Sequence, residues 1–279
     1  GWPMTAPPES LATVVTAQPT GSPRIRRLVL EVAEPARLTV PDVPDAAVGV
    51  YLPAPDGGAP TARNYSVRAQ DGDRMTLDVV LHGHGHAAAW AAAAAPGAQV
   101  TLAYGHSWYA PQPETDWQLL VADLAGLPAL ARIVEELPQQ VPVVAVVEVA
   151  DQADLAYLPP LPTAVRLVPV AGSGNGLAPS RLARTVTDLE LPAGRGYCWL
   201  GAEAAQARAV RKLLRRENRW ELAQLDVLGY WREEQERWAE RFAPVQERLL
   251  AVYDQALVEG CSDAEATERY DEALEHAGL

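Results

Sequence analysis

The chain has 279 residues, 48% of them hydrophobic, which is enough for two domains with substantial cores. Its formal net charge of −13 argues against general nucleic-acid binding, because that function needs a basic face to neutralise phosphates. Its two cysteines lie far apart and do not form a disulfide scaffold, and no apolar run approaches the ~20 residues of a membrane-spanning helix.

Up to about residue 115 the sequence has the pattern of short strands separated by turns, with proline and glycine at the breaks. We expect six strands, at residues 11–16, 24–32, 48–52, 64–67, 75–81 and 99–104. An alanine-rich helix is expected at 87–95, where Pro96 and Gly97 end it. Short strands at this spacing favour an antiparallel barrel over a parallel sheet.

From Trp117 the pattern changes to continuous apolar strands that alternate with amphipathic helices. The expected strands are residues 117–122, 141–149, 164–170, 196–200 and 224–230, and the expected helices are 127–137, 179–189 and 204–216. This alternation is typical of a parallel sheet with helices on both faces.

After Trp231 the chain is charged and helical, with one helix expected at 233–257 and another at 264–276. Ser262 and Glu265 have the spacing of a capping box at the start of the second helix. We therefore predict a β-barrel plus an α/β fold, divided into a barrel domain (1–115), a parallel-sheet domain (116–231) and a helical C-terminal extension (232–279).

The segment Arg63-Asn64-Tyr65-Ser66-Val67-Arg68 is the first candidate binding motif. An arginine, an aromatic ring and a hydroxyl on one strand can hold a phosphate, cover a planar ring and hydrogen-bond its edge. An ordinary strand with two solvated arginines fits the same pattern.

The second candidate motif runs from Asp78 to Ala91, where a strand ends in a glycine-rich turn and a helix begins. The free amides at a helix N-terminus and the close approach that glycine permits suit a pyrophosphate. His82, His84 and His86 offer a metal site as an alternative, although no acidic residue or cysteine completes the ligand set. A chance clustering of histidines in a loop is the third interpretation.

Two further features have ordinary structural interpretations. The run Gly172-Ser173-Gly174-Asn175-Gly176 lacks the spacing of a dinucleotide fingerprint and follows the third strand of its domain, so we expect a loop. The basic helix from Arg208 to Arg216 is typical of a solvated face, although in an acidic chain it can also attract an anionic ligand.

The order of these motifs along the chain resembles that in the siderophore-interacting protein family. Its members are FAD-dependent ferric-siderophore reductases of the ferredoxin-reductase-like superfamily. Members have an Arg-x-Tyr-Ser/Thr strand, a His-Gly strand end and a Gly-Pro-Ala-x-x-Trp-Ala helix start. The matching segments here are Arg63 to Ser66, His82-Gly83, Gly85 to Ala91, Asp123, Leu127-Pro128-Ala129, Trp199 to Glu203 and Gly229 to Arg232. His86 replaces the proline, Leu124 and Ala125 replace a Glu-Thr pair, and Gly105-His106-Ser107-Trp108 stands where relatives often have Gly-Pro-Arg-Gly.

The resemblance implies that FAD lies between the barrel and the parallel sheet. Arg63 would neutralise its pyrophosphate with amides near Gly85 to Ala88, Tyr65 would stack on the isoalloxazine and Ser66 would hydrogen-bond near N5. The flavin contacts expected on this basis are Arg63, Asn64, Tyr65, Ser66, Val80, His82, Gly85, Ala87, Ala88, Trp90, Asp123 and Trp231. The departures at Leu124, Ala125 and His106 affect the contacts expected from the second domain.

The activity implied by the resemblance is reduction of Fe(III) in a siderophore complex to Fe(II), with electrons from NADH or NADPH. A cofactor-poor siderophore-binding module and a general NAD(P)H:flavin reductase are the alternatives. The N-terminus lacks a basic region followed by an apolar one, so we expect no secretory signal. We expect a cytoplasmic monomer whose partner is a ferric siderophore, with no nucleic-acid partner and no resident metal.

Overall fold

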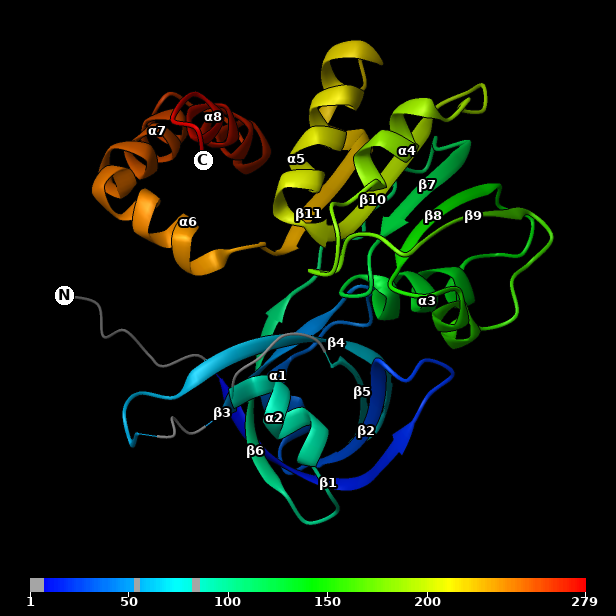
Figure 1. Cartoon of the computed structure of the whole chain (residues 1–279), viewed down its shortest axis with the longest axis vertical. Coiled ribbons are helices and arrows are strands. Elements are labelled where there is room, and N and C mark those ends of the chain that lie inside the picture. Colours follow the sequence, from blue (N-terminus) through cyan, green and yellow to red (C-terminus); the bar gives the residue numbers. More distant parts are fainter. Residues whose placement is uncertain (1–7, 53–55, 82–85) are drawn as a thin grey trace.

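The computed structural model describes residues 8–52, 56–81 and 86–279, and its first unit is a closed barrel of six antiparallel strands (Figure 1). The strands are β1 (Glu9–Pro19), β2 (Ile25–Val32), β3 (Ala47–Leu52), β4 (Thr61–Asp71), β5 (Arg74–Val80) and β6 (Gln99–His106). They pair in the order β1-β2-β5-β4-β3-β6, and β1 closes the barrel on β6. Alternate residues point inward, so Leu28, Leu30 and Val32 of β2 are all buried in the barrel core.

Two helices accompany the barrel, the short α1 (Pro35–Leu38) and α2 (His86–Ala93). Ala91 is buried in the barrel core and Trp90 packs against it, so α2 is anchored by its apolar side. Arg26 on β2 donates to the carbonyl oxygens of Ala91 and Ala92, which are among the unpaired acceptors at the C-terminal end of this helix.

The second unit is a five-stranded parallel sheet in the order β11-β10-β7-β8-β9. Its strands are β7 (Trp117–Ala122), β8 (Val143–Val149), β9 (Val165–Ala171), β10 (Gly196–Glu203) and β11 (Leu225–Trp231). The chain runs from β7 outward through β8 to β9, then crosses back to β10 beside β7. The topological switch point therefore lies between β7 and β10, and in open α/β sheets ligands bind outside the carboxyl ends of the strands at such a point.

Helices cover both faces of this sheet, so its central strands are buried throughout. Helix α3 (Leu127–Glu136) and the 3₁₀ helix η1 (Gln152–Tyr157) pack on one face. Helices α4 (Leu182–Asp188) and α5 (Ala204–Lys212) pack on the other. A π-helical turn, η2 (Leu213–Glu217), extends α5, and the 3₁₀ turn η3 (Leu222–Gln224) leads into β11.

The barrel and the sheet are joined by polar contacts on the α3 side of the sheet. Arg132 of α3 donates to the Val67 carbonyl oxygen on β4 (2.8 Å), and Arg68 pairs with Glu135 of α3 (2.7 Å). Asp45, fully buried just before β3, accepts from Nε1 of Trp199 on β10 (3.0 Å). These bonds orient β4 and the barrel rim toward the carboxyl edge of the sheet.

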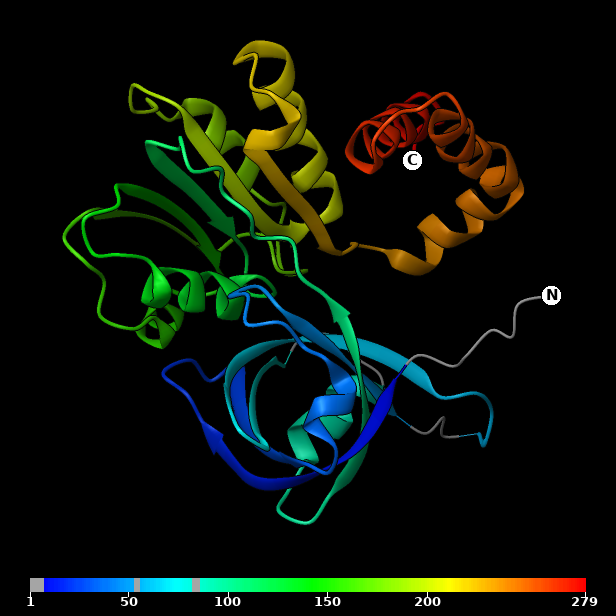
Figure 2. The ribbon, with the colours of Figure 1, turned by 180° about the vertical axis from the view of Figure 1, so that it is seen from behind.

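The C-terminal segment forms α6 (Gln235–Phe242), the 3₁₀ turn η4 (Ala243–Val245), α7 (Gln246–Val258) and α8 (Asp263–His276). Figure 2 shows these helices beyond β11, on the side of the sheet that carries α5. Helices α7 and α8 pack as an antiparallel pair around Leu249, Ala256, Ala266 and Leu274. Ser262 and Glu265 form the expected capping box at the start of α8.

The predicted architecture of antiparallel barrel, parallel sheet and C-terminal helices is confirmed. The single helix expected at 233–257 was wrong, because Pro244 interrupts the helical hydrogen bonding and separates α6 from α7. The strand expected at 64–67 is longer, since β4 runs from Thr61 to Asp71. Within the described residues, no helix combines the length and the apolar character needed to span a bilayer.

Candidate functional site

The end of the barrel nearest the sheet carries two neighbouring rows of residues that include aromatic and hydroxyl side chains. Across β4, β3 and β6, the register aligns Tyr65 with Val48 and Tyr104, and Ser66 with Ala47 and His106. Residues paired in this way project from the same face of the sheet. Tyr65 and Ser66 are therefore close to the start of the link between β6 and the second unit.

Arg63 and Tyr65 lie two residues apart on β4, on one side of the strand. Burial raises the pKa of Tyr65, while the positive charge of Arg63 acts to lower it, so the guanidinium lies near the phenol. Arg63 is exposed and has no ion-pair partner among the described residues. An exposed guanidinium beside a half-buried aromatic ring suits a ligand that carries both a phosphate and a planar ring system.

The other barrel residues expected at the site take different positions. Asn64 is exposed on β4, while Ala87 and Trp90 of α2 are half-buried and pack against the same barrel core as Tyr65. Ala88 is half-buried in the first turn of α2. Val80 packs instead against the core between α3 and the sheet. His82 and Gly85, and with them His84 of the alternative metal site, lie outside the described residues.

An aromatic cluster connects the barrel rim to β11. The His106 ring lies 4.1 Å from the Trp108 ring and 5.8 Å from the Tyr230 ring, centroid to centroid. Burial lowers the pKa of His106 and raises that of Tyr230, so both are neutral at pH 7. His106 Nδ1 and Tyr230 Oη are buried, and neither has a hydrogen-bond partner within the described part of the chain. Both atoms lie close to Ser66, because His106 is aligned with Ser66 across β3 and its ring is near Tyr230.

At the carboxyl edge of the sheet, Asp123 and Trp231 are in direct contact. Asp123 follows β7 and is 2% exposed, and its Oδ2 accepts from Nε1 of Trp231 (2.8 Å) and from the Glu203 amide (3.0 Å). Burial raises the pKa of Asp123 to about 6, and these hydrogen bonds act in the opposite direction. Asp123 therefore holds the end of β11 against the end of β7.

A pocket of about 500 Å³ opens beside this contact, at the switch point of the sheet. Glu203, at the end of β10, caps α5 by accepting from the amides of Ala205 and Gln206. Glu148, on β8, accepts from the hydroxyls of Ser173 (2.8 Å) and Ser180 (2.6 Å). The described residues lining the pocket include five carboxylates, from Asp123, Glu148, Glu203, Glu233 and Glu234.

Comparison with known proteins assigns this arrangement to a family. A family model described as a siderophore-interacting FAD-binding domain matches residues 24–106, and one described as a siderophore-interacting protein matches residues 115–234. The chain belongs to the siderophore-interacting protein family. Ferredoxin reductases share the fold at lower sequence identity.

The solved structures include a siderophore utilization protein from T. fusca, 29% identical over 81% of this chain and 93% of that chain, with a TM-score of 0.69. Among curated proteins, an uncharacterized protein of Mycobacterium tuberculosis is 38% identical over 91 residues, 32% of each chain. The mycobactin import ATP-binding/permease protein IrtA of that organism is 30% identical over 67% of this chain. The matches span only 32% and 22% of the lengths of these two curated relatives.

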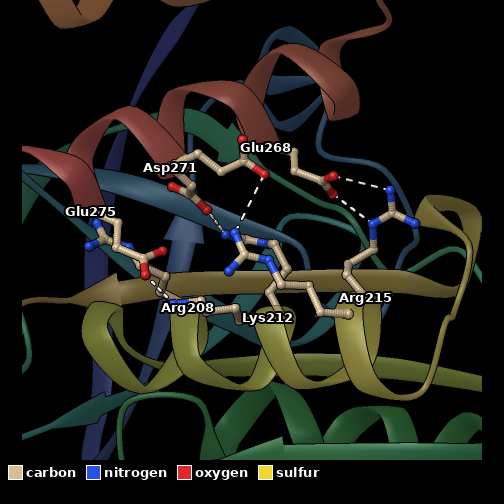
Figure 3. Close-up of a pocket in the computed structure, with 9 residues that line it drawn as sticks. Arg208, Lys212, Arg215, Glu268, Asp271 and Glu275 are labelled. Atoms are coloured by element: carbon tan, nitrogen blue, oxygen red, sulfur yellow. Dashed lines mark hydrogen bonds and ion pairs between the residues drawn. The ribbon is translucent and has the colours of Figure 1, made fainter.

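Within this siderophore-interacting protein, the basic helix α5 is occupied by internal ion pairs. Arg211 and Lys212 of α5, and Arg215 of the adjoining η2, pair with Asp271, Glu275 and Glu268 of α8 (Figure 3). Arg208 donates to the carbonyl oxygen of Leu279 at the end of the chain. The acidic face of α8 therefore neutralises this helix, so the anion-attracting interpretation is not favoured in this conformation.

Sequence reasoning did not identify four residues that shape the site: His106, Tyr230, Glu203 and Asn175. Glu203 and Tyr230 lay within matched motifs, but their roles depend on contacts made in the folded chain. Asn175, in the expected glycine loop, has a left-handed φ of 59° and accepts from the Leu124 amide with its side chain (2.9 Å). Its position after a strand, within a glycine run, was the available signal.

Proposed function

We propose that this protein is an FAD-dependent ferric-siderophore reductase. The observation that carries the proposal is Arg63, which has no ion-pair partner in the described part of the chain, next to half-buried Tyr65 and buried Ser66. These residues lie on a barrel matched by a siderophore-interacting FAD-binding family. Arg63 would hold the FAD pyrophosphate, Tyr65 would cover the isoalloxazine face, and Ser66 would donate a hydrogen bond to the ring edge. Bound FAD would accept two electrons and release them singly.

The substrate would be Fe(III) held by a siderophore, and the proposal accounts for iron release by ligand preference. Siderophores offer hard oxygen donors that suit Fe(III), and reduction to the softer Fe(II) weakens the complex. The exposed Trp108 and Tyr104 at the barrel rim would allow a large complex to approach the flavin edge without being enclosed. In this scheme the protein contributes position and electrostatics rather than a covalent step.

Asp123 would contribute to the site by holding Trp231 in place. The hydrogen bond from Trp231 Nε1 fixes the indole at the end of β11, beside the aromatic cluster that begins at Tyr230. Trp231 would then bound the flavin cleft on the side of the sheet. Asp123 is a positioning residue in this scheme, because its oxygens are already bonded to protein donors.

A siderophore-binding module without flavin is the second candidate, favoured by Leu124 and Ala125 in place of the family's Glu-Thr pair and by His106 at the barrel rim. The two candidates differ in one simple observation. The reductase binds FAD and absorbs near ~450 nm, whereas the binding module stays colourless after incubation with FAD.

The family resemblance makes NADH or NADPH the expected electron donor. The carboxyl edge of the sheet does not fit their phosphates. Its amides already donate to protein oxygens, and the carboxylates that line the pocket repel a phosphate. We therefore propose the transfer from flavin to iron and derive no step from a nucleotide. The cytoplasmic location and the monomeric state remain predictions from the sequence.

Titration with FAD tests the proposed seat. Arg63→Ala should weaken FAD binding about 10- to 100-fold, the range expected when one charge-assisted contact to phosphate is lost. Arg74→Ala is the matched control, since Arg74 is an exposed arginine on the β4–β5 hairpin of the same barrel. Flavin fluorescence quenching gives the dissociation constants, and equal values for wild type and Arg63→Ala would reject the assigned role.

A further inference from the structure

The amide groups at the switch point of the sheet are unusually well supplied with protein acceptors. Dinucleotides bind such sheets by placing their phosphates against free amides at the turn after the first strand and at helix N-termini. In this chain that turn joins β7 to α3, and the neighbouring turn joins β10 to α5. The partners of these amides therefore decide whether a phosphate has a place to bind.

In the β7–α3 turn, three successive amides are already bonded. The Leu124 amide donates to Asn175 Oδ1 (2.9 Å), the Ala125 amide to Asp123 Oδ1 (3.0 Å), and the Gly126 amide to the Asp123 carbonyl oxygen (3.2 Å). Asn175 reaches this turn from the loop after β9. The side chain of Asn175, which lines the pocket, therefore occupies the Leu124 amide.

At the β10–α5 turn, the Glu203 side chain occupies the amides at the N-terminus of α5. Its Oε2 accepts from Ala205 (2.8 Å) and Gln206 (3.2 Å), and its Oε1 accepts from the Glu233 amide (3.2 Å). A carboxylate in this position supplies the negative charge that a helix N-terminus favours. A phosphate could bind here only by displacing Glu203.

The side chains around the pocket add a repulsive field. Of its described lining residues, five carry carboxylates and Arg232 carries a guanidinium, which lies over the Trp238 ring at 4.0 Å. Arg181, beyond β9, is bonded to Ser173 Oγ and to the Ala171 carbonyl oxygen. Arg211 and Lys212 of α5, and Arg215 of the adjoining η2, are paired with α8. Arg208 of α5 lies near Glu203 and donates to the Leu279 carbonyl oxygen.

We infer that this crevice selects against electron donors that carry a pyrophosphate, and that Glu203 and Asn175 are the specificity-determining residues. Glu203 acts by charge and by capping α5, and Asn175 by occupying the Leu124 amide. The inference rests on the proposed function in taking bound FAD as the electron acceptor. The crevice discriminates by a built-in repulsive element, which is how specific sites reject related ligands.

Calorimetric titration of the FAD-loaded full chain with NAD⁺ and NADP⁺ tests the inference without turnover. Wild type should not saturate below about 1 mM, the upper end of typical substrate ranges. Glu203→Gln removes the charge, and Asn175→Gly frees the Leu124 amide at a φ that glycine tolerates, so each should bind at least about tenfold more tightly. Glu190→Gln removes one negative charge from an exposed position on the loop before β10, and this control should behave as wild type.

The inference fails if wild type binds either nucleotide with a dissociation constant below about 1 mM. It also fails if both variants, shown by melting curves to be folded, bind no more tightly than wild type.

A kinetic comparison needs no variant. Anaerobic reduction of bound FAD by NADH is compared with reduction by the phosphate-free N-benzyl-1,4-dihydronicotinamide, each rate divided by that donor's rate with free FAD. We expect a normalised advantage of at least about tenfold for the phosphate-free donor, which falls as salt screens the carboxylates. Equal normalised rates would overturn the inference but leave the proposed function intact. Absence of bound FAD would instead reject the proposed function.

Discussion

At the scale of single residues, Asp123 controls how the carboxyl edge of the sheet is assembled. Its carboxylate accepts from Trp231 and from the amides of Ala125 and Glu203, and so connects β7, β10 and β11. The sequence motifs predicted Asp123 and Trp231 as site residues, and the fold brings the two into contact. The link from Asn175 to Leu124 had no such signal, because it joins two loops 51 residues apart.

The raised pKa of Asp123 predicts a specific dependence of stability on pH. Burial raises this pKa from 3.8 to about 6, so between pH 4 and 6 the folded protein binds a proton that the unfolded chain releases. The free energy of unfolding therefore falls as the pH rises through this window, by about 3 kcal/mol for a two-unit shift. Above about pH 7, one unit beyond the folded-state pKa, the contribution of Asp123 no longer changes.

Urea unfolding of wild type and Asp123→Asn at pH 4.5 and pH 7 measures this effect. The asparagine cannot ionise, so the wild type should lose about 2 kcal/mol more than the variant between the two pH values. Asp73→Asn, on the exposed β4–β5 hairpin, should follow wild type. A parallel pH dependence for Asp123→Asn and wild type would show that Asp123 does not titrate in this range.

At the scale of elements, sequence periodicity was sufficient where each element is determined locally. The continuous apolar run of β7 and the alternating pattern of β2 predicted buried and half-buried strands. The break between α6 and α7 was missed although Pro244 was visible, because charged residues continue the helical pattern on both sides. The pairing of α8 with α5 was not predictable, since opposite charges on two helices do not specify their contact.

The contact between α8 and α5 predicts a salt-sensitive C-terminal element. Exposed and partly exposed ion pairs contribute roughly 0.2–1 kcal/mol each and weaken as salt is added. Raising NaCl from about 0.05 to 1 M should therefore accelerate amide exchange in α8, measured by hydrogen–deuterium exchange, while β10 stays protected as the internal control. Glu268→Gln should produce part of the same acceleration at low salt, because it removes the partner of Arg215.

Unchanged exchange in α8 under both conditions would mean that apolar packing, rather than the ion pairs drawn in Figure 3, holds this helix to the body.

At the scale of the whole molecule, the candidate site lies where the barrel and the sheet meet. The sequence predicted both units and the motifs within them. How they are joined depends on contacts between distant residues, such as Asp45 with Trp199, 154 positions apart. The resulting arrangement sets Tyr65 and Ser66 on one side and Tyr230 and Trp231 on the other, with His106 between them. The same fold places protein carboxylates where a nucleotide's phosphates would bind.

The central claim is that flavin held at the barrel rim passes electrons to siderophore-bound iron. The direct test is to photoreduce the FAD-loaded protein anaerobically, add a ferric siderophore and trap the Fe(II) with a chromogenic chelator. The account predicts reoxidation of the flavin with about two Fe(II) formed per flavin, independent of any nucleotide. Flavin that stays reduced in the presence of the ferric siderophore, with no Fe(II) trapped, would contradict it.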